Sequence, residues 1–247
     1  MKTRIVILAA GNSRRMNGVH KVLLPIGEKP MVTRVVDAAV TSGVDSHPVV
    51  VVGKNGEAVR KALGDQCEYV TQEEQLGTGH AVHCVEAALR GKADAVLVLY
   101  GDNPCVKPET IKRLAEAHAE KKPSITMFTT TVSDFNDWRK PFYDFGRLVR
   151  DARSALVKSV EKKDATVEEL AIKELNPSFY CFDATWLWEN LRKIKRHNAQ
   201  RECYLPDLIQ IAINQGDTVD MAPVDPREVI GVNTPEQLEI VRQLSKE

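Results

Sequence analysis

The junction that follows the first apolar run of the chain has the residue types of a phosphate-binding turn. The run is Ile5–Ile7, and the residues after it read L-A-A-G-N-S-R-R-M. Gly11 lets main-chain N–H groups approach a ligand closely, and Arg14 and Arg15 place cations beside them. A strand and a glycine turn also open many α/β domains that bind nothing there. The motif therefore predicts a phosphate site only together with the rest of the chain.

Two further segments carry polar residues where an element is expected to begin or end. Asp102 follows the apolar run Ala95–Tyr100 in the sequence Y-G-D-N-P. Gln72 and Gln75 precede L-G-T-G-H-A, a polar, glycine-rich entry to a predicted helix whose N–H groups would face an anion or a base edge. Because open α/β sheets bind ligands at the carboxyl ends of their strands, we expect these residues to share one site with Gly11.

The elements that must position these residues alternate along the chain. Apolar, β-branched runs predict strands over Arg4–Ala10, Pro48–Val52, Ala95–Tyr100, Ser124–Thr130 and Ser178–Phe182. Helical patterns include one from Val32 that stops at Gly43, one that starts at Pro108 and one that starts at Thr234-Pro235. Alternation of strand and helix predicts a three-layer, Rossmann-like α/β/α domain with a mostly parallel sheet.

The pattern of apolar and polar residues changes near residue 132. Short alternating pieces, Arg147–Arg150 and Leu156–Val160, are joined by charged and aromatic connections. No repeat or linker divides the chain into independent parts. We therefore expect residues 1–247 to form a single domain that carries a small β-rich insertion over approximately residues 132–182.

Composition excludes several classes of partner. Lys plus Arg and Asp plus Glu each number 34, so the net charge is zero and there is no broad positive field for nucleic acid or an anionic membrane. The five cysteines lack C-x-x-C spacing, which fits neither a disulfide framework nor a zinc cluster. Neither a leader peptide nor a long apolar stretch is evident. These features indicate a cytoplasmic protein that binds neither nucleic acid nor membrane.

Nine motifs, in this order, give the chain a family resemblance. They are L-A-A-G with R-M, H-K-V-L-L-P, Q-E-E-Q-L-G-T-G-H-A, L-Y-G-D-N-P, F-G-R-L-V-R, V-E-K-K-D-A-T, K-E-L-N, N-A-Q-R-E-C-Y-L-P-D and E-V-I-G-V-N-T. The whole chain resembles the sugar-phosphate nucleotidyltransferases, and most closely the uridyltransferase domain of bacterial N-acetylglucosamine-1-phosphate uridyltransferase. The resemblance implies the nucleotide-diphospho-sugar transferase fold, with the insertion on the sugar side.

The resemblance also implies a magnesium site. Asp102 and Asn233 match the family's metal ligands, and two protein oxygens suffice because Mg²⁺ completes its shell with phosphates and water. Taken alone, each residue fits a structural role better: Asp102 as a helix N-cap or turn residue before Pro104, and Asn233 as an N-cap before Thr234-Pro235. Their place in the ordered set favours the metal role.

The same resemblance implies residues that bind the nucleotide and its phosphates. Arg15 and Lys21 match the catalytic cations that grip the triphosphate and the sugar phosphate. The nucleotide-binding set comprises Leu8, Ala10, Gly11, Gln72, Gln75, Gly77 and Thr78, in which amide side chains match the donor and acceptor edge of uracil and Gly77 allows close backbone approach.

Sugar contacts are implied for Tyr100, Gly101, Gly146, Glu161, Asn176 and Tyr204. Several departures from the family pattern surround these residues. Phe145 stands where Tyr is common, Pro177-Ser178 replaces a small residue and Gly, and the connection from Ser133 to Tyr143 is longer than usual. The identity of the sugar is therefore the least constrained part of the prediction.

The expected activity is Mg²⁺-dependent formation of UDP-N-acetylglucosamine and pyrophosphate from UTP and N-acetylglucosamine 1-phosphate. The alternatives are a glucose or muramic acid type of uridylyl- or thymidylyltransferase, the cytidylyltransferase of isoprenoid synthesis, and a non-catalytic nucleotide-sugar sensor on the same fold. No hexapeptide repeat occurs in these residues, so we expect no acetyl transfer from them. The sequence leaves the oligomeric state open.

Overall fold

A ten-stranded sheet forms the centre of the computed structural model, which describes residues 1–11 and 20–245. The strands follow the order β5-β4-β1-β6-β11-β7-β10-β8-β9, and β12 pairs with β7. Their bounds are β1 Thr3–Ala9, β4 Val49–Gly53, β5 Glu68–Gln72, β6 Ala95–Tyr100, β7 Ile125–Thr131, β8 Gly146–Arg150, β9 Leu156–Val160, β10 Glu174–Asn176, β11 Tyr180–Asp183 and β12 Val219–Pro223. A separate two-stranded pair consists of β2 Pro25–Ile26 and β3 Lys29–Pro30.

Strand direction places the carboxyl ends of four strands at one edge. β1 pairs in parallel with β4 and β6, and β5 pairs in parallel with β4. β11 lies antiparallel between β6 and β7, whereas β12 is parallel to β7. The segments that leave β1, β5 and β6 therefore emerge side by side, as the sequence predicted for an α/β sheet.

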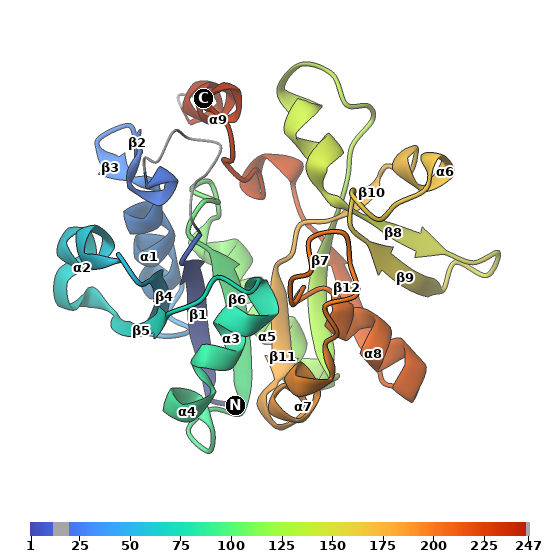
Figure 1. Ribbon diagram of the computed structural model, residues 1–247, viewed down its shortest axis with the longest axis horizontal. Helices are drawn as coiled ribbons and strands as arrows, with labels where there is room; N and C mark the ends of the chain where they lie inside the picture. The colour runs from blue at the N-terminus through green and yellow to red at the C-terminus, as the bar shows by residue number, and fades with distance from the viewer. Residues whose placement is uncertain (12–19, 246–247) are drawn as a thin grey trace.

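Helices cover both faces of the sheet (Figure 1). One face is covered by α1, α2, α5 and α9, and the other by α3, α4, α7 and α8. The α-helices are α1 Met31–Thr41, α2 Glu57–Leu63, α3 Thr78–Cys84, α4 Glu86–Leu89, α5 Pro108–Lys121, α6 Val167–Leu170, α7 Ala184–Asn190, α8 Asp207–Gln215 and α9 Pro235–Leu244. The 3-10 segments are η2 Lys21–Leu23, η3 Gly64–Gln66, η4 Asp137–Asp144, η5 Leu191–Lys193 and η6 Pro226–Glu228.

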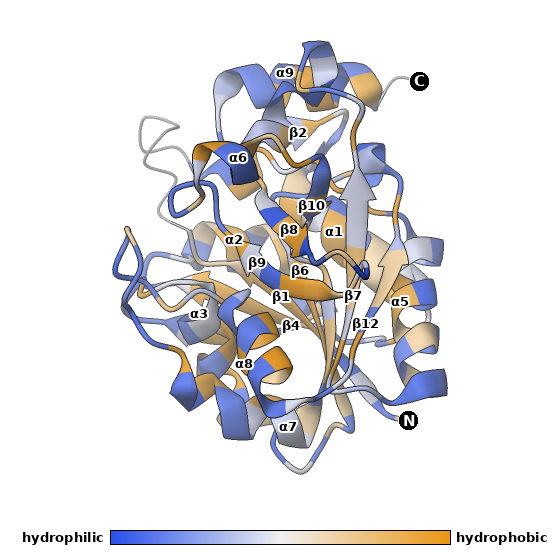
Figure 2. Ribbon diagram, turned by 90° about the vertical axis from the view of Figure 1, so that its right-hand side faces the viewer, coloured by the Kyte–Doolittle hydropathy of each residue, from blue (hydrophilic) through white to orange (hydrophobic). Residues whose placement is uncertain are grey.

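Alternation along β1 separates two apolar cores. Ile5 and Ile7 pack with α1 and α5, whereas Val6 and Leu8 pack against α3 and α7 on the opposite face. Successive strand side chains point to opposite faces, so a strand with cores on both sides is apolar throughout. The central strands accordingly lie as an apolar layer between helices with polar outer faces (Figure 2).

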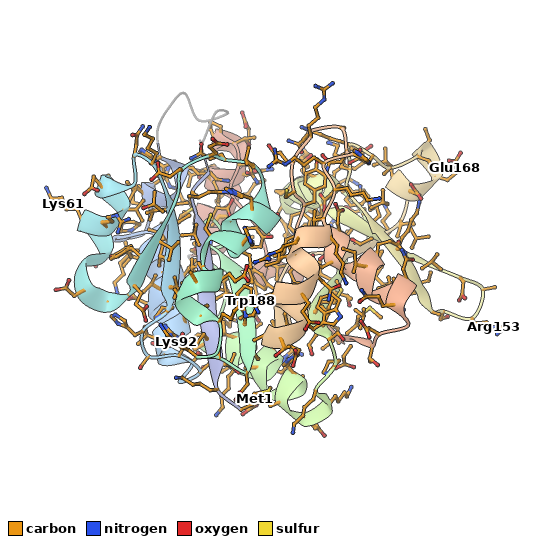
Figure 3. All side chains as sticks on the ribbon, turned by 60° about the horizontal axis from the view of Figure 1, so that its bottom comes forward. Met1, Lys61, Lys92, Arg153, Glu168 and Trp188 are labelled. Atoms are coloured by element: carbon orange, nitrogen blue, oxygen red, sulfur yellow. The ribbon has the colours of Figure 1, made fainter. Side chains whose placement is uncertain are left out.

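The segment from 132 to 182 builds one end of the molecule. The antiparallel strands β8 and β9 form a hairpin, and β10 joins β8 to the end of β7. The tip of this hairpin, at Arg153, and Lys61 of α2 lie at opposite ends of the molecule (Figure 3). Tyr180–Asp183 lies instead within the main sheet, as β11.

Most predicted ends of strands and helices lie within one or two residues of the observed ends. The mostly parallel sheet with helices on both faces is confirmed. All five cysteines are unpaired, and two of them, Cys67 and Cys181, are buried. Within the described residues, no helix has both the length and the apolar character needed to cross a bilayer.

Candidate active site

A cavity of about 920 Å³ opens at the carboxyl ends of β1, β5 and β6 and extends to the β8–β10 segment. Most of the residues singled out from the sequence line it. They are Leu8, Ala10, Gly11, Lys21, Gln72, Gln75, Gly77, Thr78, Tyr100, Asp102, Gly146, Glu161, Asn176, Tyr204 and Asn233. Arg14 and Arg15 lie outside the described residues.

Gly101 is the member of the predicted sugar-binding set that the structure places behind the cavity wall. It is buried, and a Cβ there would lie 3.3 Å from the Cβ of Ala9 and 3.4 Å from a methyl group of Val32. The absence of a side chain at Gly101 thus allows the turn after β6 to pack against β1. Its neighbour Tyr100 lines the cavity.

Lys21, Asp102 and Asn233 meet in one corner of the cavity. The Lys21 ammonium donates to Asp102 Oδ2 and to Asn233 Oδ1, the latter at 2.7 Å. The backbone N–H of Val232 also donates to the carbonyl of Asp102 at 3.0 Å, which joins the two loops. Thr234, and not Asn233, caps α9 by accepting a hydrogen bond from the backbone of Gln237. The alternative interpretation of Asn233 as an N-cap is therefore wrong.

This corner has the donor chemistry of a Mg²⁺ site. Asp102 supplies a carboxylate oxygen and Asn233 an amide oxygen, and both already contact a single positive charge. Hard oxygen donors of this kind suit Mg²⁺, which takes one or two protein ligands and completes its shell with phosphate and water. The residues present therefore fit a divalent cation bound together with phosphates.

The base side of the cavity is built from the end of β5 and the start of α3. Gln72 is 3% exposed, and its Nε2 lies 3.2 Å from the carbonyl of Gly77 and 2.9 Å from Nδ1 of His80. These contacts fix the orientation of the Gln72 amide. His80 thus has a local structural role, and burial lowers the pKa of its imidazole.

Position 77 must be glycine for a structural reason that the sequence did not reveal. Its φ is +108°, and a Cβ there would lie 2.5 Å from the carbonyl oxygen of Cys203. The backbones of the two segments are bonded on either side, from Cys203 N–H to Leu76 and from Gly79 N–H to Cys203. The close approach that Gly77 allows in this structure is therefore to Cys203, and it ties the base side to the 198–206 loop.

Glu161 occupies a poorly solvated position on the sugar side. Burial, followed by the negative charges of Asp207 and Asp164, raises the pKa of Glu161 to about 7, and the charge of Arg147 acts in the opposite direction. One carboxylate oxygen of Glu161 lies 3.1 Å from the position a Cβ would take on Gly146. Gly146 therefore provides the space in which the Glu161 carboxylate sits.

Asn176 and Tyr204 also line the sugar side, but their polar atoms already have protein partners. Asn176 Nδ2 donates to Tyr180 Oη at 2.7 Å and to Ser159 Oγ at 3.0 Å, and its Oδ1 accepts from Ser178 N–H. Tyr204 Oη donates to Gln200 at 2.7 Å. In this structure, Asn176 therefore supports the wall of the cavity as well as lining it.

An ion pair on the cavity wall was missed at the sequence level. Asp144 and Lys162 both line the cavity, and their charged groups are 2.6 Å apart. They lie 18 positions apart in the sequence. The only local signal is that Asp144 precedes F-G-R and that Lys162 follows Glu161, so each adjoins a motif of the sugar side.

Arg147 holds this wall in place from behind. It is 0% exposed, and its guanidinium lies beside the rings of Phe135 and Tyr143, at 5.1 and 5.3 Å from their centroids. It also donates to the carbonyls of Tyr143 and Phe145. A buried cation stabilised by rings and carbonyls in this way packs the long 133–145 connection against β8.

Comparison with known proteins identifies the class of protein that this fold and cavity define. The model of the MobA-like NTP transferase domain matches residues 5–201. The chain therefore belongs to this family of nucleotidyltransferases.

Two curated proteins are similar to nearly the whole of this chain. The bifunctional protein GlmU of Exiguobacterium sibiricum is 43% identical over 230 residues, which cover 92% of this chain and 49% of the relative. GlmU of Listeria monocytogenes serotype 4a is 40% identical over 234 residues, covering 94% of this chain and 50% of the relative. The chain thus spans about half the length of these relatives.

Two solved structures share the fold. UDP-glucose pyrophosphorylase complexed with UDP-glucose superposes with a TM-score of 0.78 at 17% identity, covering 100% of this chain and 99% of that chain. CMP:2-keto-3-deoxy-manno-octonic acid synthetase complexed with CTP gives a TM-score of 0.71 at 20% identity, with the same two coverages. At these identities the likeness shows the fold alone, and it confirms the expected nucleotidyltransferase fold.

Proposed function

We propose that this chain transfers a uridylyl group from UTP to N-acetylglucosamine 1-phosphate and releases pyrophosphate. A phosphate oxygen of the sugar phosphate bonds to the α-phosphorus of UTP, and the bond from that phosphorus to the bridging oxygen of the leaving pyrophosphate breaks. The observation that carries the proposal is the convergence of Lys21, Asp102 and Asn233 inside one cavity. Two likenesses support this choice of substrates. The ordered motifs resemble those of the uridyltransferase domain, and nearly the whole chain is similar to GlmU.

The chain's own residues divide the work between two sides of the cavity. Gln72 and Gln75 would read the uracil edge through their amides, and Glu161 would bind sugar hydroxyl or amide groups on the opposite side. Lys21, together with Arg15 from outside the described residues, would neutralise phosphate charge. Asp102 and Asn233 would hold Mg²⁺, which when bound supplies charge neutralisation for the triphosphate and the departing pyrophosphate.

The test is a substrate panel with purified protein. UTP, dTTP and CTP are each combined with N-acetylglucosamine, glucosamine, glucose and muramic acid 1-phosphates in the presence of Mg²⁺, and pyrophosphate and nucleotide sugar are quantified. The proposal requires the highest kcat/KM for UTP with N-acetylglucosamine 1-phosphate. A preference for glucose 1-phosphate or another nucleotide would replace the substrate assignment. Nucleotide-sugar binding without turnover on the whole panel would overturn the enzymatic role.

Asp102→Asn provides the matched test of the site. It keeps the shape of the side chain but removes the negative charge, so we expect turnover to fall by about a hundredfold or more, corresponding to roughly 2.7 kcal/mol in the barrier. Asp65→Asn makes the same chemical change at an exposed residue outside the cavity. It should leave turnover within twofold of the wild type.

A further inference from the structure

Lys21 occupies the position from which Asp102 and Asn233 would hold a metal ion. Its ammonium contacts the carboxylate of one and the amide oxygen of the other. The side chains of Lys21 and Asp102 are only 14% and 16% exposed. The two oxygen ligands are therefore already satisfied by a cation that belongs to the protein.

A free divalent ion competes with this arrangement for the same atoms. To bind between Asp102 and Asn233 it must displace the Lys21 ammonium, because the two positive charges cannot occupy the same contacts without strong repulsion. It must also lose part of a tightly held hydration shell. This exchange separates the Lys21 ammonium from the carboxylate of Asp102 in a poorly solvated corner.

A metal ion that arrives on a triphosphate removes this obstacle. The phosphates bring several negative charges, and they offer the Lys21 ammonium a new partner while the metal takes its former ligands. Lys21 begins the short segment η2, and its four-carbon side chain can change direction without movement of the sheet. The exchange thus conserves the balance of charge in the corner.

We propose that Lys21 acts as an internal cation that holds the Asp102–Asn233 site against free metal, so that the site accepts a metal–nucleoside triphosphate complex. This gives Lys21 a role in selecting the form of the ligand. The identity of the nucleotide in this inference rests on the proposed function. The competition between the ammonium and the metal does not depend on it.

The experiment measures binding of Mn²⁺ alone, without nucleotide, by the electron paramagnetic resonance signal of the free ion. Lys21→Met keeps an unbranched side chain that is one atom shorter and removes the ammonium, and Lys21→Gln is a second neutral variant. Each should bind Mn²⁺ at least about tenfold more tightly than the wild type. Addition of Asp102→Asn to Lys21→Met should abolish the gain.

The matched control is Lys29→Met. Lys29 pairs with Asp37 at 2.6 Å on the surface, so its removal also releases a carboxylate, and among the described residues no second oxygen ligand pairs with Lys29. Its affinity for Mn²⁺ should stay within twofold of the wild type. Equal affinities for wild type and Lys21→Met, or an equal gain in Lys29→Met, would overturn the proposal.

The wild type supplies a measurement that requires no variant. Mn²⁺ and UTP together should raise its melting temperature by more than the sum of their separate shifts, because each removes a barrier to the other. Additive shifts would count against the proposal. If no nucleotide sugar forms but Lys21→Met still gains Mn²⁺ affinity, the proposed reaction fails and the role of Lys21 stands. If nucleotide sugar forms but the Mn²⁺ affinity of Lys21→Met is unchanged, the reaction stands and the role of Lys21 fails.

Discussion

The side-chain oxygen of Gln237 accepts a hydrogen bond from the backbone N–H of Asn233, with 2.6 Å between the two atoms. The other end of this buried amide lies 3.4 Å from Asp144, whose carboxylate in turn pairs with Lys162. Gln237 thus connects the proposed metal ligand Asn233 with the ion pair on the cavity wall. None of these residues is adjacent in the sequence, so the connection exists only in the folded chain.

Replacement of Gln237 by Met should disturb the proposed chemistry more than it disturbs the fold. Loss of the acceptor for the half-buried N–H of Asn233 costs on the order of 1 kcal/mol, and here it also loosens the loop that carries Asn233. We expect kcat in the uridylyl transfer assay to fall roughly tenfold, or about 1.4 kcal/mol.

The control for Gln237 is a glutamine on the same helix. Gln243 is exposed and pairs with Glu239 one turn away, so Gln243→Met makes the same change away from the cavity. Steady-state kinetics and thermal unfolding are measured for both variants. Equal kcat in Gln237→Met and the wild type would remove Gln237 from any positioning role.

Gly146→Ala should weaken binding of the sugar phosphate. The new Cβ would lie 3.1 Å from a carboxylate oxygen of Glu161, so that carboxylate must move. We expect KM for the sugar phosphate to rise roughly tenfold, with a smaller change in kcat. At Gly231, also on the cavity wall, the nearest atom to an added Cβ is Asn103 Nδ2 at 3.5 Å, so Gly231→Ala should change KM little.

A double-mutant cycle tests the cause of that effect. If Gly146→Ala acts through Glu161, its effect on KM should shrink when Glu161 is already Ala. An unchanged effect in the Glu161→Ala background would show that the methyl group acts on some other part of the wall.

Glu161→Gln should stabilise the protein above neutral pH. The pKa of Glu161 is raised from 4.5 to about 7, so the folded state holds a proton that the unfolded state releases between these values. This group therefore contributes less stability as the pH rises through that window. Gln has no such dependence, and the gain of the variant should grow to a maximum of about 3 kcal/mol by pH 8.

Urea unfolding at pH 5 and pH 8 measures this difference directly. The free energy of unfolding of Glu161→Gln should exceed that of the wild type at pH 8 and approach it at pH 5. Glu189→Gln, on the exposed side of α7, controls for loss of a negative charge and should show no such trend. A gain of equal size at both pH values would contradict burial as the cause.

Gly77→Ala should unfold the base side of the cavity or destabilise the whole chain. The positive φ alone costs about 1–2 kcal/mol, and the contact of 2.5 Å with Cys203 adds a steric clash with backbone. Gly91 also has a positive φ, of +73°, but no atom lies within 4 Å of an added Cβ. The melting temperature should therefore fall clearly further in Gly77→Ala than in Gly91→Ala, and equal losses would refute the packing argument.

The local sequence pattern was sufficient to predict the strands and helices and many of the residues that line the cavity. The alternation in β1, the proline at the start of α5 and the glycine after α1 are short-range signals, and short-range sterics and burial determine strands and helices. Ordered motifs then indicated Asp102, Gln72 and Glu161, and the first two lie on segments that leave parallel strands at one edge. For Gln72 and Asp102, the direction of parallel strands makes that convergence predictable.

Contacts across long stretches of sequence were beyond such reasoning. The Lys21 ammonium could have faced solvent, and only the packing of η2, β6 and α9 brings it to Asp102 and Asn233, 81 and 212 positions away. Gly77 was predicted to let the backbone approach a ligand, and the folded chain adds a second reason for glycine there, its close approach to Cys203. Periodicity reports which face of an element is buried, but not which distant element covers it, because that choice depends on the packing of the whole chain.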